Sequence, residues 1–467
     1  MDTSAGNQEL VFDAALIKRY DQAGPRYTSY PTALQFHDQF DDSLYQRVVH
    51  DAQNDSVSSP LSLYIHLPFC ATVCFYCACN KVVTKHRWRA KPYLQQLYRE
   101  IEMQAALFDS KRTVDQLHWG GGSPNFLSLE LMTELMDAIK QYFHLRDDDQ
   151  GDYSVEIDPR EVDQHTVQGM RELGFNRMSV GIQDFDPAVQ KAVNRIQSFD
   201  QTASIIQAAR QAEFKSINTD LIYGLPLQTY DSFTQTLDLV LQLSPDRISV
   251  FNYAHLPQRF KPQRRIKQSE LPSAAEKLSI MQLAIEQLMH AGYVYIGMDH
   301  FAKPDDELAT AQRHNNLHRN FQGYSTRPDC DLIGMGVSAI GKIGNSYSQN
   351  VKTLDAYQDS IESNRIPVSK GVELTFDDRL RRCVIERIIC NFHLRKSDIE
   401  NEFSIDFDQY FLPELKMLKQ MQHDELLALD QNAITILPKG RLLVRNICMV
   451  FDRYVNQAMP ESYSKAI

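Results

Sequence analysis

The sequence predicts an α/β protein whose main domain is a parallel β-sheet, open or curled into a partial barrel. Two observations support this fold class. Six short runs rich in β-branched and aromatic residues recur between residues 61 and 253, and helical stretches separate them. Strands and helices that alternate in this way imply right-handed crossovers, which set successive strands parallel in one sheet.

An extended arm is predicted before this domain, and a different pattern follows it. Residues 24–32 (GPRYTSYPT) are too rich in Pro, Gly and Ser for a helix or a central strand, so residues 1–60 are predicted to be an arm with one short helix near residues 14–20. The strand–helix repeat defines a barrel domain over residues 61–350. Residues 351–467 are predicted to form a mainly helical, winged-helix-like domain, and the total length suits two or three domains.

Short apolar runs give the predicted strands. They occupy residues 61–66, 114–119, 153–158, 177–182, 217–223 and 247–253. Two further runs, residues 294–301 and 331–341, could extend the sheet. The clearest helix begins near Pro92, where apolar residues recur at helical spacing on one face.

The C-terminal part departs from this alternation. Residues 377–392 and 398–403 are predicted to be helices, and residues 433–444 a small hairpin. Helix-plus-wing modules include DNA-binding domains, but the chain carries 49 Lys and Arg against 60 Asp and Glu, a formal charge of −11. Because nonspecific nucleic-acid binding needs a broad basic surface, no nucleic-acid partner is expected.

Composition also bounds the location of the protein. Hydrophobic residues make up 43% of the chain and charged residues 23%, which fits a globular protein rather than a disordered one. The sequence has no run of about 18 apolar residues, so no membrane span is expected. The N-terminus lacks the basic start and apolar run of a secretory signal, and we therefore expect a cytoplasmic protein.

A cluster of cysteines is the strongest chemical signal. Cys70, Cys74 and Cys77 form a C-x3-C-x2-C motif in a loop directly after the first predicted strand. Thiolate ligands favour zinc or an iron–sulfur cluster. Structural zinc usually takes two cysteine pairs far apart in sequence, and no second pair exists here. Three thiolates in one loop suit a 4Fe–4S cluster with one open iron, and zinc and dithiol redox chemistry remain alternatives.

At this point the sequence resembles a known family. The motif after the first strand of a repeated βα unit is similar to the signature of the radical S-adenosylmethionine superfamily. The segments YIHLPFC, HWGGGSP, GPRYTSYPT, VNR, DLIYGLP and FNYAH, with the additional Cys79, together resemble the oxygen-independent coproporphyrinogen III oxidases. The resemblance runs from about Gly24 to the C-terminus and implies a partial β/α barrel of the radical S-adenosylmethionine type.

The resemblance also implies an activity. Members would hold one 4Fe–4S cluster, here on Cys70, Cys74 and Cys77, and would cleave S-adenosylmethionine to a 5′-deoxyadenosyl radical. The radical abstracts a hydrogen from a propionate of coproporphyrinogen III, and loss of carbon dioxide and one electron leaves a vinyl group. Two such events give protoporphyrinogen IX in haem biosynthesis. Cys79 is implied to be a catalytic candidate that does not ligate the cluster.

Matching motifs imply the residues that bind two S-adenosylmethionine molecules. The first molecule would contact Tyr64, Tyr76, Gly121, Glu156 and Ile340, and the second Gly122, Ser123, Gln183, Arg195, Asp220 and Ala254. Ser123 stands where the family often has Thr, which keeps the hydroxyl. Several of these residues lie at or just past the C-terminal ends of successive predicted strands, where parallel β/α folds bind ligands.

A substrate with four propionates needs cations that the acidic chain does not supply overall. The candidates are Arg26 in the arm, Arg264 and Arg265 in the run KPQRRIK with Lys261 and Lys267, and behind them Arg313 and Arg319. Guanidinium groups are favoured because they bind carboxylates through two parallel hydrogen bonds.

Two other functions stay open on the sequence. Relatives in the same superfamily resemble haem carriers that keep the barrel and cysteines, but they typically lack the arm and the C-x-C ending that this chain has. A zinc-containing regulator is the second alternative. The favoured enzyme would act as a monomer and take electrons from a reducing donor such as a flavodoxin-type protein.

Overall fold

The fold is described from a computed structural model, which places residues 10–54, 59–327 and 330–455. The chain forms two compact units. The larger unit consists of Gln35–Ile280 and Asp329–Glu373, and the smaller unit of Met1–Leu34, Met281–Pro328 and Leu374–Ile467. The predicted domains, divided at residues 60 and 350, are each one continuous stretch of chain. Each of these two units instead combines segments that lie far apart in the sequence.

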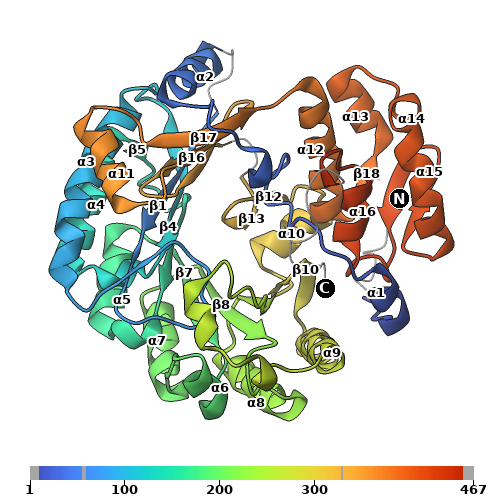
Figure 1. The fold of residues 1–467 in the computed structure, drawn as a ribbon, viewed down its shortest axis with the longest axis horizontal. Helices are drawn as coiled ribbons and strands as arrows, with labels where there is room; N and C mark the ends of the chain where they lie inside the picture. Colours follow the sequence, from blue (N-terminus) through green and yellow to red (C-terminus); the bar gives the residue numbers. More distant parts are fainter. Residues whose placement is uncertain (1–9, 55–58, 328–329, 456–467) are drawn as a thin grey trace. The chain divides into compact units, whose positions relative to one another are not determined.

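Seven parallel strands form the centre of the larger unit, in the order β9-β8-β7-β6-β4-β1-β14. They are β1 (Leu61–Leu67), β4 (Thr113–Gly121), β6 (Asp152–Ile157), β7 (Arg177–Gln183), β8 (Ser216–Tyr223), β9 (Arg247–Asn252) and β14 (Asp331–Met335). The helices between them are α3 (Ala90–Ala105), α4 (Leu129–Tyr142), α5 (Gln164–Leu173), α6 (Pro187–Ala192), α7 (Phe199–Gln211) and α8 (Tyr230–Leu243). These helices follow one another around the outside of the curved sheet, which confirms the predicted partial β/α barrel (Figure 1).

The two faces of this sheet differ in chemistry. In β6, β7 and β8 every second residue is buried, and all of these except Thr219 are hydrophobic, among them Val155, Val180 and Leu221. The alternate positions are polar and pair across strands: Tyr64 lies beside His118, and His118 beside Ser154. A pleated strand sends successive side chains to opposite faces. The inner face is therefore lined with polar groups, as a ligand-binding face would be.

An antiparallel extension continues the sheet beyond β14. It consists of β15 (Ile340–Ile343), β16 (Ser346–Asn350) and β17 (Val368–Glu373). The larger unit also contains helices α2 (Asp42–Asn54) and α11 (Leu354–Glu362) and the short strands β2 (Phe69–Cys70), β3 (Val82–Val83) and β5 (His144–Leu145). Helix α9 (Ala274–His290) leads along the chain toward the smaller unit.

The smaller unit is mainly helical. Its helices are α1 (Ala14–Tyr20), α10 (Glu307–Arg313), α12 (Phe376–Asn391), α13 (Lys396–Phe403), α14 (Phe407–Tyr410), α15 (Leu412–His423) and α16 (Val444–Val450). Its strands form the hairpins β10 (Val294–Gly297) with β11 (His300–Ala302) and β12 (His318–Asn320) with β13 (Gly323–Ser325), and a three-stranded sheet of β18 (His393–Arg395), β20 (Ala433–Ile436) and β19 (Leu427–Leu429).

The arm lies against the C-terminal part of this unit. Arg445 donates from Nε to the Pro25 carbonyl at 3.0 Å and also bonds the Gly24 carbonyl. Asn446 donates to the Tyr20 carbonyl at 2.7 Å, and the Tyr27 hydroxyl donates to Asp452 at 3.0 Å. Side chains of α16 thus donate hydrogen bonds to backbone carbonyls of the arm, which have no partners in any described helix or sheet.

Most predicted elements are confirmed, with one correction. The six predicted strands, the helix over residues 14–20 and the two C-terminal helices agree with the structure within a few residues. The prediction of a hairpin over residues 433–444 is wrong, because only Ala433–Ile436 forms a strand and it pairs with β18 and β19. Instead, the Gly440 N–H donates to the Leu437 carbonyl in a turn that lies directly against the Leu426 backbone, and the chain then enters α16.

No helix among residues 10–54, 59–327 and 330–455 is both long enough and apolar enough to cross a membrane.

Candidate functional site

The loop with the three motif cysteines begins at the carboxyl end of β1. The short strands β2 and β3 pair in parallel and close the loop at its base. Lys81 Nζ donates to the carbonyls of Cys77 and Cys79 at 3.2 and 3.4 Å, and Gln263 donates to the Tyr76 carbonyl at 2.9 Å. Hydrogen bonds from several elements therefore fix a segment that has almost no regular structure.

Three consecutive residues contact the same loop. They are Val193–Arg195, the VNR motif. The Val193 carbonyl accepts from the Phe75 N–H at 2.9 Å, and the Asn194 side chain donates to the Val73 carbonyl at 2.7 Å. Arg195 Nη1 lies 3.6 Å from Cys74 Sγ. The motif following β7 is thus a clamp on the cysteine loop.

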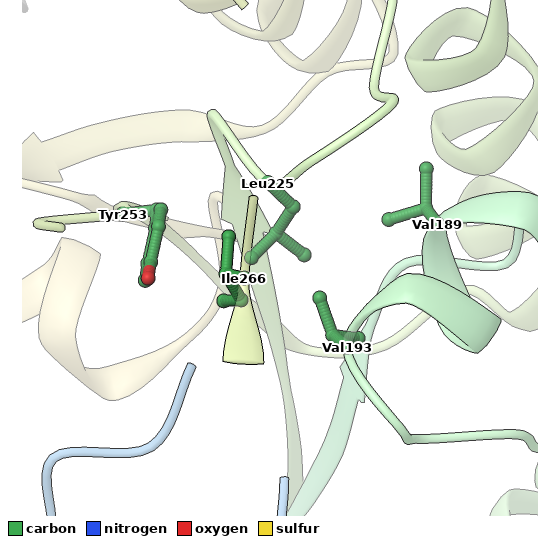
Figure 2. Close-up of a cluster of buried hydrophobic side chains, with 5 residues drawn as sticks. All are labelled: Val189, Val193, Leu225, Tyr253 and Ile266. Carbon is green, nitrogen blue, oxygen red and sulfur yellow. The ribbon is translucent and has the colours of Figure 1, made fainter. Parts of the chain in front are cut away.

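Aromatic residues of the loop complete this attachment. Phe75 and Tyr76 pack against a buried apolar cluster of the larger unit, shown in Figure 2 and formed by Val189, Val193, Leu225, Tyr253 and Ile266. The Arg265 guanidinium lies 5.1 Å from the centre of the Phe75 ring. The side chains between the cysteines therefore anchor the loop on the barrel.

Cys74 is surrounded by positive charge. Arg160 Nη2 lies 3.7 Å and Arg195 Nη1 3.6 Å from its sulfur, and both guanidinium groups also bind Asp158, at 2.6 and 3.2 Å. Burial alone would raise the pKa of Asp158, but the two guanidinium groups outweigh it and lower the pKa to about 2. Asp158 is therefore ionised, and this group of three side chains carries one net positive charge.

The glycine-rich turn after β4 approaches the loop from the other side. Gly121 has φ +105°, a conformation that glycine adopts without strain. A Cβ on Gly122 would lie 2.6 Å from the Phe69 carbonyl oxygen. The Ser123 hydroxyl lies 3.8 Å from Cys70 Sγ. Glycine is thus required for the turn to lie directly against the cysteine loop.

A first group of predicted site residues lies on β1, β4, β6 and β15. Tyr64 stacks on His118 with ring centres 5.8 Å apart, and His118 Nε2 lies 3.1 Å from a Glu156 oxygen. The Gly121 N–H donates to the other Glu156 oxygen at 3.3 Å. A Cβ on Gly334, the neighbour of Tyr64 in the sheet, would lie 2.5 Å from the Ile340 carbonyl oxygen, so Ile340 is close to the same strand.

A second group lies on β7, β8 and the segment after them. Gln183 has φ +72°, and a Cβ on Gly181 would lie 2.9 Å from Gln183 Nε2 and 3.0 Å from Arg195 Nη2. Asp220 accepts from Ser179 at 3.0 Å and lies beside Gly181 in the sheet, and Ala254 comes two residues after β9. Gln183 Oε1 and Arg195 Nε are buried and form no hydrogen bond with any residue that the structure describes.

The pKa values of two thiols in the motif, Cys70 and Cys77, are shifted in opposite directions. Burial raises the pKa of Cys70 to about 11, against a hydrogen bond from Ser123. A hydrogen bond with Cys79 lowers the pKa of Cys77 to about 5, and the nearby Lys81 ammonium acts in the same direction.

Comparisons with known proteins agree with this geometry. The Radical SAM superfamily matches residues 64–240, and the HemN C-terminal domain matches residues 374–443. The oxygen-independent coproporphyrinogen III oxidase of Pseudomonas aeruginosa is 53% identical over 98% of this chain and 99% of its own length. The chain belongs to the oxygen-independent coproporphyrinogen III oxidase family.

Other members give the same result. The oxygen-independent coproporphyrinogen III oxidase of Escherichia coli is 47% identical over 98% of this chain and 99% of its own length. A solved structure of coproporphyrinogen III oxidase from Escherichia coli, described as a radical SAM enzyme, superposes with a TM-score of 0.90 over 96% of this chain and all of that one. The haem-carrier alternative gains no support from these relatives.

The radical SAM family implies a 4Fe–4S cluster and S-adenosylmethionine, and the residues present fit both. Cys70, Cys74 and Cys77 share one loop, and Cys74 and Cys77 each add to the electrostatic rise in the Cys70 pKa, so the three sulfurs are neighbours. No three His, Cys, Asp or Glu side chains in the described parts of the chain could hold a single metal ion. A cluster binds each thiolate at a separate iron, so its ligands stand farther apart. The unpartnered atoms of Gln183 and Arg195 are suited to a polar ligand.

The structure also shows what surrounds the basic residues that were predicted to bind the propionates of the substrate. Arg26 forms an ion pair with Asp299 at 2.6 Å within the smaller unit. Arg264 is exposed and donates to the Pro257 carbonyl at 3.0 Å, while Arg265 is exposed over Phe75. Arg313 donates to the Pro304 carbonyl at 2.8 Å.

Sequence reasoning missed three residues beside the cysteines of this oxidase family member. Asn125 donates to the Asp158 carbonyl and accepts from the Asp158 N–H, at 2.9 and 3.0 Å, and Asp158 in turn holds Arg160 and Arg195. The signals available were a polar residue directly after the glycine-rich turn and the D-P-R segment directly after β6.

Proposed function

We propose that this protein catalyses the oxygen-independent oxidative decarboxylation of two propionates of coproporphyrinogen III, which yields protoporphyrinogen IX in haem biosynthesis. The observation that carries the proposal is the identity of 53% over nearly the full length of an oxidase with that name. The radical S-adenosylmethionine chemistry agrees with three cysteines at the mouth of a parallel β/α barrel.

In this proposal Cys70, Cys74 and Cys77 hold a 4Fe–4S cluster, and Cys79 does not. When bound, the cluster and S-adenosylmethionine supply the radical that abstracts a propionate hydrogen. The protein fixes the loop through the Val193–Arg195 clamp and the glycine-rich turn. Ser123, Arg160 and Arg195 place N–H and O–H donors on two of the three sulfurs.

Two S-adenosylmethionine molecules would occupy the two groups of polar side chains. Tyr64, Tyr76, Gly121, Glu156 and Ile340 would hold the first molecule, and Gly122, Ser123, Gln183, Arg195, Asp220 and Ala254 the second. The support is that the two groups lie on adjacent strands, and that Gln183 Oε1 and Arg195 Nε are buried without partners among the described residues. An Arg195→Ala variant should keep its iron but bind fewer than two equivalents, while Arg171→Ala on α5 should bind both. Wild-type stoichiometry in Arg195→Ala would rule out this role.

Arg26, Arg264 and Arg265 are the candidates for the propionates of the substrate. The exposed guanidinium groups of Arg264 and Arg265 retain N–H donors for carboxylates. Arg26 already forms an ion pair with the carboxylate of Asp299, and a propionate could bind it in the same way.

We further infer that the protein is a cytoplasmic monomer that receives electrons from a reducing protein such as a flavodoxin. The clustered Cys70, Cys74, Cys77 and Cys79 form no disulfide, which suits a reducing compartment. The proposed chemistry needs an electron of low potential, because the cluster must be reduced before S-adenosylmethionine is cleaved.

One experiment tests the function. The reconstituted protein is incubated without oxygen with coproporphyrinogen III, S-adenosylmethionine and dithionite. Protoporphyrinogen IX, carbon dioxide and 5′-deoxyadenosine should appear together, and a Cys74→Ser variant should form none of them. Tight stoichiometric haem binding without turnover would contradict the proposal.

A further inference from the structure

Arg160 contacts the cysteine loop but belongs to neither group of proposed cofactor-binding residues. It lies in the turn after β6, and its side chain is 13% exposed. Its Nη2 lies 2.6 Å from Asp158 Oδ2 and 3.7 Å from Cys74 Sγ. The same guanidinium group thus bridges a carboxylate and the sulfur of a proposed cluster ligand.

Neutralisation of Asp158 does not explain this arrangement. Arg195, with a side chain 7% exposed, already binds both oxygens of Asp158, at 3.2 and 3.4 Å. A second buried guanidinium leaves one uncompensated positive charge, and burying such a charge is costly unless a negative group lies near it. Cys74 Sγ is the neighbouring group that becomes negative when it ligates iron.

Hydrogen bonds within the protein also fix the position of Arg160, without any contribution from a cluster. Asn125 binds both backbone groups of Asp158, and the Asp158 side chain accepts from the Arg160 backbone N–H at 3.1 Å as well as from its guanidinium. Asn125 is 1% exposed and lies just after the glycine-rich turn. Residues in and after this turn therefore contact two of the sulfurs, one directly and one through other side chains. Ser123 contacts Cys70 directly, and Asn125 reaches Cys74 through Asp158 and Arg160.

We propose that Arg160 is a positioning residue that stabilises negative charge on Cys74 and thereby raises the reduction potential of the cluster. One electron enters the cluster from the donor, no proton is transferred, and the added charge spreads onto the ligand sulfurs. Hydrogen bonds to sulfur and nearby charge are established determinants of cluster potential. The inference rests on the proposed function only in requiring that the cluster is present.

The test is a potentiometric titration of the reconstituted cluster, without S-adenosylmethionine or substrate, followed by the signal of the reduced cluster. Arg160→Gln should keep the wild-type iron content and show a more negative midpoint potential. Arg160→Lys, which retains the charge without the fork of donors, should fall between the two. Arg171→Gln is the matched control, because Arg171 pairs with Asp149 away from the cysteines, and it should titrate as the wild type does.

A midpoint in Arg160→Gln equal to that of Arg171→Gln would overturn the inference. If Arg160→Gln loses its iron, Arg160→Lys decides: an unchanged midpoint overturns the inference, and a more negative one supports it. Failure of the proposed function is distinguishable, because it would appear as a wild-type protein that binds no cluster or converts no porphyrinogen.

Discussion

The three cysteines of the motif differ in the groups that meet their sulfur atoms. Cys70 faces a serine hydroxyl, Cys74 two guanidinium groups, and Cys77 the thiol of Cys79. The C-x3-C-x2-C spacing indicates which residues can reach a cluster, but the groups at Cys70 and Cys74 come from residues 53, 86 and 121 positions away in the chain. This is why the sequence predicts the ligands and not their surroundings.

At the scale of single residues, Cys74 and Cys79 should respond differently to substitution. Cys79→Ser should retain about four irons per chain after anaerobic reconstitution, whereas Cys74→Ser should lose most of them, because a fourth thiolate would occupy the iron that must stay open. Iron analysis of both variants checks this. Equal loss in the two variants would contradict the assignment of three ligands.

Glu100 provides a second prediction for a single residue. This fully buried carboxyl on α3 accepts from the Gly336 N–H at 2.7 Å, from Asn350 at 2.8 Å and from Tyr357 at 2.5 Å. Burial raises its pKa from 4.5 to about 7, despite these donors. The contribution of Glu100 to the free energy of unfolding is therefore complete below pH 4.5. It is lost as the pH rises toward 7, because in this range the folded protein still holds a proton that the unfolded chain has released.

The free energy of unfolding should thus contain a part that falls by about 3 kcal/mol between pH 4.5 and 7. Glu100→Gln should flatten the pH profile of denaturant unfolding by this amount. Glu172→Gln, at an exposed position on α5, should leave the profile unchanged. A Glu100→Gln profile parallel to that of the wild type would show that the carboxyl does not titrate in this range.

At the scale of elements, the arm depends on α16 for its conformation. Arg445 is buried and bonds the carbonyls of Gly24 and Pro25. Arg445→Met would leave both carbonyls without their donor, at a cost of about 2 kcal/mol in the free energy of unfolding. Trypsin should then cleave the arm faster at Arg26.

The matched control for this prediction is Arg19→Met. Arg19 is 60% exposed and pairs with Asp424 on the surface of the same unit. Exposed ion pairs contribute little, so this variant should change the stability by less than about 1 kcal/mol. An arm that resists trypsin equally in Arg445→Met and Arg19→Met would mean that other contacts, such as Tyr27 with Asp452, suffice to hold it.

At the scale of the whole molecule, local patterns predicted the sheet better than the packing between distant segments. The strand over residues 61–66 is buried on both faces and is mostly apolar, and the strand over residues 177–182 has an apolar residue at every second position, so both could be predicted from local composition. The hairpin over residues 433–444 failed because β20 pairs with β19, which precedes it, and with β18, which lies far earlier in the chain, instead of with the residues that follow it.

The candidate site shows the same limit. Residues at strand ends, such as Gly121 and Gln183, could be predicted because all parallel strands end at one edge of a sheet. Arg160 could not, because its importance depends on its distance to a cysteine 86 residues earlier in the chain.

Two propionates and two groups of cofactor-binding residues lead to the last prediction. Each decarboxylation needs its own radical, so two S-adenosylmethionine molecules should be consumed for each protoporphyrinogen IX formed. The ratio of 5′-deoxyadenosine to product, measured anaerobically at several reaction times, should approach two, and a product with one vinyl group should appear first. If the Gln183 and Arg195 group holds the second molecule, Gln183→Ala should accumulate this one-vinyl product, whereas Gln164→Ala, at an exposed position on α5, should not. A ratio near one in the wild type would mean that a single cofactor serves both steps and that the second group of residues has another ligand.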